Sequence, residues 1–381
     1  MIVLRELWWA VSDKALDTKD AVEEWFFDEK KSLYGAAACR IILGLSILLL
    51  LIGNFSTRQL WVGPASVWAD PARAISNFPE MAILDGASSG IVTLVYLFVL
   101  FSTFAFTIGW HTRVATIFTL IGYIAITSQN PTVGNQADNI IRLTLLWFLL
   151  IDSSEHWALD SRRRISKPAM AVDSDVTALQ HAWNSHETVP AWLSNSFHNI
   201  GIAGLAAQTI LIYMTAGLSK IAESSWRHGT ALYSTMQLPD YRPFPAISDL
   251  FSHSRFLLAV ITYAILLSQL FFAPLLLNKI TRTLILALAI TVNVFFGLIM
   301  SLPVSSLAII AATGIFISGP AYEAVAGWIG DELIPVRYWL ADRTDGLRDR
   351  WDDLRDRVDE AREERANRPK KSAEAVADDA D

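Results

Sequence analysis

Long apolar runs with almost no internal charge recur along this 381-residue chain, and they restrict its fold more than any other feature. A helix needs about 20 predominantly apolar residues to cross a bilayer. Runs that approach this length lie at 36–53, 89–109, 114–128, 140–152, 199–219, 256–277, 283–301 and 303–319. The pattern predicts an all-α, polytopic membrane protein built as a bundle of about eight transmembrane helices.

The composition agrees with a lipid environment and excludes several other classes of protein. Hydrophobic residues make up 52% of the chain and charged residues 18%, whereas a soluble protein carries about a quarter charged residues. There is no basic face with interleaved aromatic residues, so we expect no nucleic-acid partner. The single cysteine, Cys39, excludes an intramolecular disulfide and any cysteine-based zinc or iron–sulfur site, and no histidine pair has HExxH spacing. We therefore expect no metal.

The basic residues in the loops predict the orientation of the bundle, because cytoplasmic loops carry an excess of Lys and Arg. They cluster in alternate connections, at Lys30, Lys31, Arg40, His111, Arg113, Arg162 to Arg164, Lys167, Lys279 and Arg282. The loop at 129–139 has neither Lys nor Arg, which places it outside together with 54–88 and 220–255. We expect a multi-pass protein of the plasma membrane with both termini in the cytoplasm.

The two flanking segments predict a division of the chain into three parts. Residues 1–30 carry apolar side chains at three- and four-residue spacing among charges, as in a helix that lies on a membrane surface. Residues 31–320 form the transmembrane domain. Residues 321–381 predict a charged amphipathic helix on the cytoplasmic side, followed by an acidic, Ala-rich end that we expect to be disordered. A solvated helix explains this tail better than a dedicated partner site does.

The first polar cluster is the outside stretch that leads into the run at 140–152. Asn135 or Asp138 can cap the incoming helix, and Asp138 with Arg142 has the i,i+4 spacing of an ion pair. Charges beside a membrane span are costly and often functional, so a substrate-facing role is one interpretation. A cap with a local ion pair near the headgroups would place the same residues equally well. Both interpretations remain open on this evidence.

The second polar cluster lies where the run at 199–219 ends on the outer side. An isolated lysine at this place, Lys220, would most often extend its ammonium to the interface. Its neighbours are unusual, however, and they are Tyr213, Glu223, Trp226, Arg227 and His228. A lysine that works as a base needs a partly dry site with carboxylates or hydroxyls nearby, and this stretch supplies such a set.

Four blocks in this chain resemble the HTTM family, the horizontally transferred transmembrane domain proteins, which are related to the membrane half of vitamin K-dependent gamma-carboxylase. They read CRIILGLSILLL from Cys39, GWHTRVAT from Gly109, NPTVGNQADNIIRLTLLWFLL from Asn130 and IYMTAGLSKIAESSWRHGTALY from Ile212. WALD follows the third block and QLPDYRPF the fourth. Because the blocks recur together and in this order, the resemblance covers most of residues 30–320.

The resemblance implies a reaction at Lys220. In the carboxylase, a lysine in an AG-x-x-K block deprotonates vitamin K hydroquinone, and oxygenation of the anion gives the strong base that acts on a glutamate side chain. Lys220 stands at the matching position, and menaquinol is the corresponding cofactor by chemical analogy. Ser219 stands where the carboxylase has a second lysine. The large extracytoplasmic domain of the carboxylase has no counterpart here, which disfavours carboxylation of propeptide-bearing proteins.

Two functional hypotheses follow. The first is a quinol-dependent, gamma-carboxylase-like membrane enzyme with Lys220 as base and with Glu223 and His228 as neighbours that handle protons. In that enzyme the site would be organised by Asn135, Asp138, Arg142, Tyr213 and Trp226. The second is a non-catalytic maturation or export factor for a secreted peptide, as in the branch that resembles maturation proteins of a sporulation-delaying toxin. Both hypotheses place a peptide or small-molecule substrate on the outer face, and a transporter is disfavoured by the absence of internal repeats.

Overall fold

The computed structural model describes residues 19–75, 79–166 and 190–332, and every regular element within these ranges is a helix. The predicted all-α class is confirmed. Most of the predicted N-terminal amphipathic helix and of the charged C-terminal tail lies outside the described residues. The chain divides into two units, Met1–Gly319 and Pro320–Asp381, and α18 (Gly319–Glu332) is the helix described at the start of the second.

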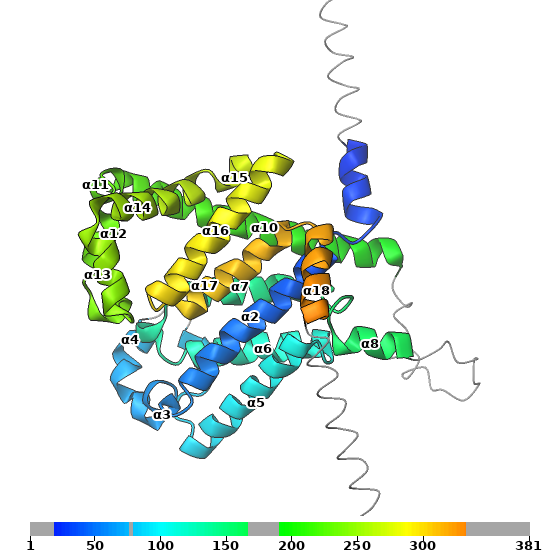
Figure 1. Cartoon of the computed structure of the whole chain (residues 1–381). Coiled ribbons are helices and arrows are strands. Elements are labelled where there is room, and N and C mark those ends of the chain that lie inside the picture. Colours follow the sequence, from blue (N-terminus) through cyan, green and yellow to red (C-terminus); the bar gives the residue numbers. More distant parts are fainter. Residues whose placement is uncertain (1–18, 76–78, 167–189, 333–381) are drawn as a thin grey trace, which may run out of the picture. The chain divides into compact units, whose positions relative to one another are not determined.

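The apolar runs of the sequence correspond to helices in the first unit (Figure 1). They are α2 (Leu33–Gly53), α5 (Ser89–Ile108), α6 (Thr112–Thr127), α7 (Gln136–Phe148), α10 (Ala191–Ala222), α14 (Arg255–Leu270), α16 (Lys279–Ile299) and α17 (Pro303–Thr313). Short helices connect them: α3 (Arg58–Trp61), α4 (Asp70–Ala74), α8 (Leu159–Ser166), α11 (Ser224–Arg227), α12 (Ala231–Thr235), α13 (Pro245–His253) and α15 (Phe272–Leu275). Single 3₁₀ turns, at Pro64–Ala69, Pro79–Met81, Pro131–Val133, Pro239–Tyr241 and Gly314–Phe316, complete the described elements.

Fewer than eight of the described helices are long enough to cross a bilayer. Within the described residues, four helices are long and apolar enough to span a bilayer, or up to six if each of two bent helix pairs is one span. The helix α7 has only 13 residues. At 1.5 Å per residue it extends about 20 Å, less than the roughly 30 Å hydrocarbon core. The membrane bundle is thus supported, whereas the count of eight helices is not confirmed.

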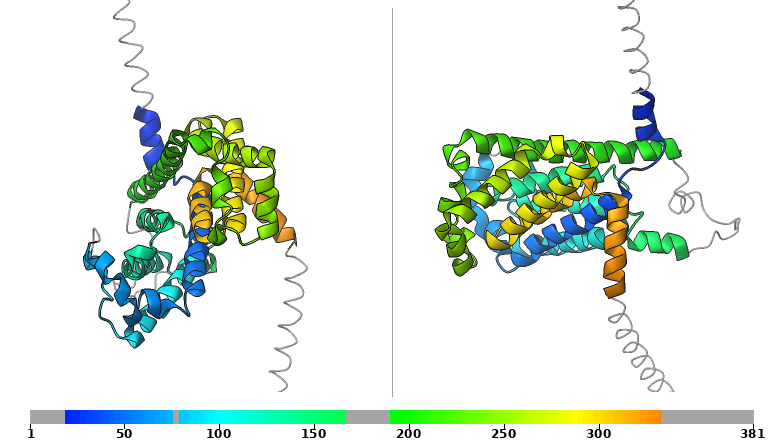
Figure 2. Two further views of the ribbon diagram at one scale, coloured as in Figure 1. Left: turned by 90° about the vertical axis from the view of Figure 1, so that its left-hand side faces the viewer. Right: turned by 45° about the horizontal axis from the view of Figure 1, so that its top comes forward.

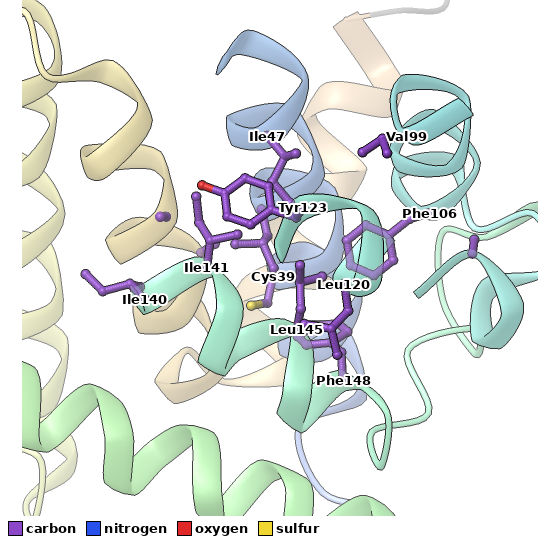
Figure 3. Packing of buried hydrophobic residues seen from close by; sticks show 14 of the residues in the cluster. Cys39, Ile47, Val99, Phe106, Leu120, Tyr123, Ile140, Ile141, Leu145 and Phe148 are labelled. Carbon is purple, nitrogen blue, oxygen red and sulfur yellow. The ribbon is translucent and has the colours of Figure 1, made fainter. Parts of the chain in front are cut away.

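The first unit contains two groups of helices with separate hydrophobic cores. The larger core joins α2, α5, α6, α7 and α17 with the first half of α10, and it includes the free thiol of Cys39. Figure 3 shows that cysteine in one cluster of buried residues with Ile47, Tyr123, Ile141 and Leu145. The smaller cores join α10, α14, α15 and α16 with the short helix α12. Figure 2 shows α10 running alongside the bundle from one end to the other.

One end of the first unit, which we call the clamp end, is held by hydrogen bonds from buried polar side chains. The Arg40 guanidinium in α2 is fully buried and donates to the carbonyl oxygens of Ser153 and, at 2.6 Å, Trp157. Lys30 Nζ lies 2.7 Å from Asp152 Oδ2. These contacts fix the segment between α7 and α8 against the start of α2.

The start of α10 holds the residues that precede α2. Asn199 Nδ2 donates to the carbonyls of Trp25, Phe26 and Glu29, and its Oδ1 accepts from the amide of Lys31 at 2.8 Å. An asparagine amide can satisfy several main-chain groups at once because it carries both donors and an acceptor. The chain therefore enters α2 along a defined path.

The opposite end, which we call the cavity end, is covered by short helices. The segment with α3 and α4 and the segment with α11, α12 and α13 both lie on the left in Figure 1, away from α8. Arg73 in α4 ties the first segment to the loop after α6, since its Nε donates to the Gln129 carbonyl at 2.8 Å. The same guanidinium pairs with Asp85. This bond network supports the cavities described next.

Candidate functional site

The cavity that contains Lys220, here called the lysine cavity, lies between the two groups of helices. It has a volume of about 470 Å³. Five helices line it: α7 with Gln136 and Ile140, α10 with Ile212, Tyr213, Thr215, Ala216, Ser219 and Lys220, α14 with Gln269, α16 with Asn293, and α17 with Ile309. Pockets of this size between the helices of a bundle are common ligand sites. The structure thus brings together the predicted Lys220 and Tyr213 with the side-chain amides of Gln269 and Asn293.

Gly217 explains how the lysine cavity is built. A side chain at this position would meet the backbone of Leu270, at 2.8 Å from its nitrogen and 2.9 Å from its Cα. Small residues permit such close approach of helices in membrane proteins. Glycine therefore lets α10 pack directly against the end of α14, and Lys220, one turn further along α10, lines the same cavity as Gln269.

Tyr213 forms the floor of the lysine cavity and belongs to a chain of hydrogen bonds with a fixed direction. Asn293 Nδ2 donates to the Tyr213 hydroxyl at 3.1 Å, and Thr313 Oγ1 lies 3.0 Å from the same hydroxyl. Thr313 in turn donates to the Ile309 carbonyl at 2.8 Å. Because the single hydroxyl proton of Thr313 is used on the Ile309 carbonyl, the Tyr213 hydroxyl donates to Thr313 Oγ1. Tyr213 therefore positions the wall and does not offer its proton to a ligand.

Two polar groups of the lysine cavity lack a conventional partner. Gln269 Oε1 is buried and accepts no hydrogen bond within the described residues. Lys220 Nζ faces the Trp226 ring at 5.2 Å from its centroid, a cation–π distance. Because a buried acceptor without a donor is costly, a hydroxyl in this cavity would relieve Gln269.

Asp138 and Arg142 line a second pair of cavities beside the first, here called the arginine cavities. Their volumes are about 460 and 310 Å³, and the two share Thr127, Gly134, Asn135 and Asp138 as walls. Arg142 lines the larger one, and Trp61 lines the smaller one. The buried Nε of Arg142 and Nε1 of Trp61 have no acceptor within the described residues. A polar ligand in these cavities could accept hydrogen bonds from the two N–H groups.

The predicted cap at Asn135 is present, but the predicted ion pair between Asp138 and Arg142 is wrong. Asn135 Oδ1 accepts from the Ala137 amide at 2.7 Å, and Asp138 Oδ2 accepts from the Asn135 amide at 2.8 Å. The other Asp138 oxygen accepts from the Tyr123 hydroxyl at 2.6 Å. Both carboxylate oxygens are thus occupied by neutral donors, and Arg142 donates instead to Thr127 Oγ1 at 2.6 Å.

Gln136 connects the two polar clusters, since it lines both the lysine cavity and the larger arginine cavity. It is the first residue of α7, directly after the cap at Asn135. Sequence reasoning did not select Gln136. The sequence shows only that Gln136 follows a capping asparagine. A position beside a helix cap does not indicate which cavity the side chain lines.

The remaining predicted residues lie outside the lysine cavity. Glu223 ends α10 and is exposed, and His228 ends α11 and is exposed as well. Neither side chain lines the cavity walls, and Lys220 and Glu223 form no ion pair within the described residues. In the described part of the chain, no group of three His, Cys, Asp or Glu side chains could hold a metal ion.

Fold and site together define an α-helical membrane protein with adjacent polar cavities at one end of its bundle. The HTTM domain model matches residues 30–319, and the chain therefore belongs to the HTTM family. No curated protein and no solved structure matches it.

Proposed function

We propose that this HTTM protein is a membrane-bound enzyme that uses a quinol, with Lys220 as the base that accepts a proton from a quinol hydroxyl. The observation that carries the proposal is the lysine cavity itself. It presents one amine, one unpartnered amide oxygen and isoleucine walls inside a helix bundle. That combination is complementary to a flat apolar ring with hydroxyl substituents.

The residues present fit menaquinol as the cofactor. Ile140, Ile212 and Ile309 supply apolar contacts for a ring system, and Gln269 Oε1 can accept from a hydroxyl. When bound, a quinol supplies a weakly acidic hydroxyl and a ring that can be oxidised to the quinone and reduced again. The fit rests on the donor set and on the size of the cavity.

The residues of the chain have separate tasks in this proposal. Lys220 in its neutral amine form takes the hydroxyl proton, so an O–H bond breaks and an N–H bond forms. The resulting ammonium faces Trp226, whose ring attracts a cation. Tyr213 and Asn293 fix the floor through their hydrogen bonds. The arginine cavities, joined through Gln136, would receive the polar part of a second substrate on the extracytoplasmic side of the plasma membrane.

The test compares Lys220→Arg and Lys220→Ala. A guanidinium stays protonated at any relevant pH and cannot act as a base. We expect both variants to accumulate normally in the membrane and to lose turnover of added menaquinol by about 10²–10⁴-fold, the usual contribution of a general base. Lys279→Arg and Lys279→Ala are matched controls, because Lys279 is exposed and lies at the start of α16. Lipid extraction of the purified wild type should yield bound menaquinone.

A fully functional Lys220→Arg variant with normal abundance would exclude the base and leave the peptide-maturation role as the explanation. Lys220 would then be an interfacial lysine whose charge and reach arginine reproduces. The readout in that case is secretion of a matured peptide by cells that carry the variant.

A further inference from the structure

The turn between α5 and α6 and the first turn of α8 form a basic corner at the clamp end of the bundle. Asp160 of α8 holds the two elements together, since its carboxylate accepts from the Thr112 amide and hydroxyl, each at 2.8 Å, and from the His111 amide at 3.0 Å. The Asp160 amide also donates to the Gly109 carbonyl at 3.0 Å. The corner is therefore a built feature and not a chance approach of two loops.

The corner carries more positive than negative charge. Within the described residues of these two turns, Arg113, Arg162 and Arg163 are exposed, and Asp160 is the one carboxylate. Arg163 lies over the Trp110 ring at 6.0 Å. Trp110 Nε1 is buried and has no acceptor within the described residues. The corner thus offers guanidinium donors to a negatively charged group, beside a tryptophan, the residue type enriched at membrane interfaces.

An apolar surface leads away from the basic corner along α5 and α6. Its side chains are each at least 40% exposed, and they are Phe98, Phe101, Phe104, Val114, Ile117, Phe118 and Ile121. Phe101 contacts Trp110 with ring centroids 5.8 Å apart, and Phe98 contacts Phe118 at 5.3 Å. The surface is therefore continuous across both helices and ends at the arginines.

We propose that this corner binds the anionic headgroup of a membrane phospholipid, whose acyl chains lie on the α5–α6 surface. Charge complementarity selects the headgroup, because each basic residue near a membrane favours anionic lipid. The adjoining apolar surface favours a lipid over a free anion, because acyl chains can pack against exposed phenylalanine side chains and a soluble phosphate cannot. This inference is independent of the reaction proposed for Lys220.

The test titrates the purified protein in detergent with short-chain phosphatidylglycerol and counts bound lipid by native mass spectrometry. We expect Arg113→Gln/Arg163→Gln to bind this lipid roughly 30-fold more weakly, from about a five- to sixfold loss for each basic residue. Arg113→Lys/Arg163→Lys should retain most of the affinity. Arg227→Gln/Arg255→Gln, which removes the same charge from exposed positions elsewhere, should bind as the wild type does.

Three results would overturn the proposal. They are unchanged affinity in the glutamine double variant, equal binding of short-chain phosphatidylcholine, and displacement of the lipid by millimolar inorganic phosphate. The last result would identify a soluble-anion site instead. Elution of each variant as a single species of wild-type size verifies that a loss of binding does not reflect misfolding.

Discussion

The clamp end and the cavity end contain similar residue types and use them differently. At the clamp end, Lys30 meets Asp152 and Glu155, and Arg40 meets two main-chain carbonyls. At the cavity end, Arg73 also pairs with Asp85, but Lys220 and Arg142, which line cavities, form no ion pair within the described residues. Cations held by carboxylates or by main-chain carbonyls stabilise a fold, whereas cations that line a cavity without such partners are available to a ligand. The number of charges near a membrane surface is thus a poorer guide to function than the identity of their partners.

The largest effect on stability that would sharpen this contrast is expected at Arg40. Arg40→Met removes the guanidinium that donates to the Ser153 and Trp157 carbonyls, and we expect a loss of about 3–5 kcal/mol in the free energy of unfolding. Arg255→Met, at an exposed arginine, should change it by no more than about 0.5 kcal/mol. Chemical unfolding in detergent measures both. Equal losses in the two variants would remove the distinction between the ends.

Asp138 tests whether the cavity end also contains structural bonds. Asp138→Ala removes the acceptor of the Tyr123 hydroxyl and one half of the cap of α7, for an expected cost of about 2 kcal/mol. Adding Tyr123→Phe should cost little more, because the two changes remove one shared bond. The charge swap Asp138→Arg/Arg142→Asp should not restore stability. Rescue by the swap would show that the two residues pair after all.

A smaller, pH-dependent effect is expected at Asp160. Partial burial opposes its ionisation, but hydrogen bonds from Thr112 and His111 outweigh burial and lower the pKa of this carboxyl. A lowered pKa means that the stabilisation is complete above the ordinary Asp pKa of about 3.9 and is lost as the pH falls through the folded-state value. Asp160→Asn should therefore cost about 1 kcal/mol at pH 7 and progressively less below pH ~4.

Thermal unfolding at pH 7, 5 and 3.5 measures this difference. The difference in melting temperature between wild type and Asp160→Asn should be the same at pH 7 and pH 5 and should begin to shrink at pH 3.5. A constant difference across the range would mean that the Asp160 charge contributes nothing.

The smallest effect on stability is expected at Gln269, in the lysine cavity. Gln269→Leu removes a buried oxygen without a partner, so the free energy of unfolding should change by less than about 0.5 kcal/mol or rise. Menaquinone retention should nevertheless fall, because a hydroxyl acceptor is lost. Lipid extraction of the variant measures the retention. If the variant retains as much menaquinone as the wild type, Gln269 does not contact the ligand.

Apolar runs were sufficient to locate the helices, and local spacing was sufficient for the cap. The boundaries predicted for 89–109 and 283–301 lie close to α5 and α16, since a long apolar run has few alternative structures in lipid. The cap at Asn135 depends on residues only two or three positions away. Such features follow from the chain locally.

The other features of the fold and the site depend on contacts between segments that are distant in the sequence, and local spacing did not predict them. The partner of Asp138 is Tyr123, 15 residues earlier, and helical spacing pointed instead to Arg142. Arg40 was interpreted only as a signal for orientation, because its acceptors lie 113 and 117 residues away. Gln269 and Asn293 reach the lysine cavity from separate helices, so no local pattern could group them with Lys220. The roles of Lys220, Glu223 and His228 stay predictions.

The contact at Gly217 has a consequence for how ligand preference can evolve in this protein. Where backbone meets backbone, the separation of α10 and α14 is fixed by the main chain, and substitutions elsewhere in the cavity cannot narrow it. Discrimination between ligands of different breadth must then come from the isoleucine side chains that line the cavity, Ile140, Ile212 and Ile309. Exchanging these for valine or phenylalanine would widen or narrow the space one methyl group or one ring at a time. The lysine would remain at the same distance from the opposite helix.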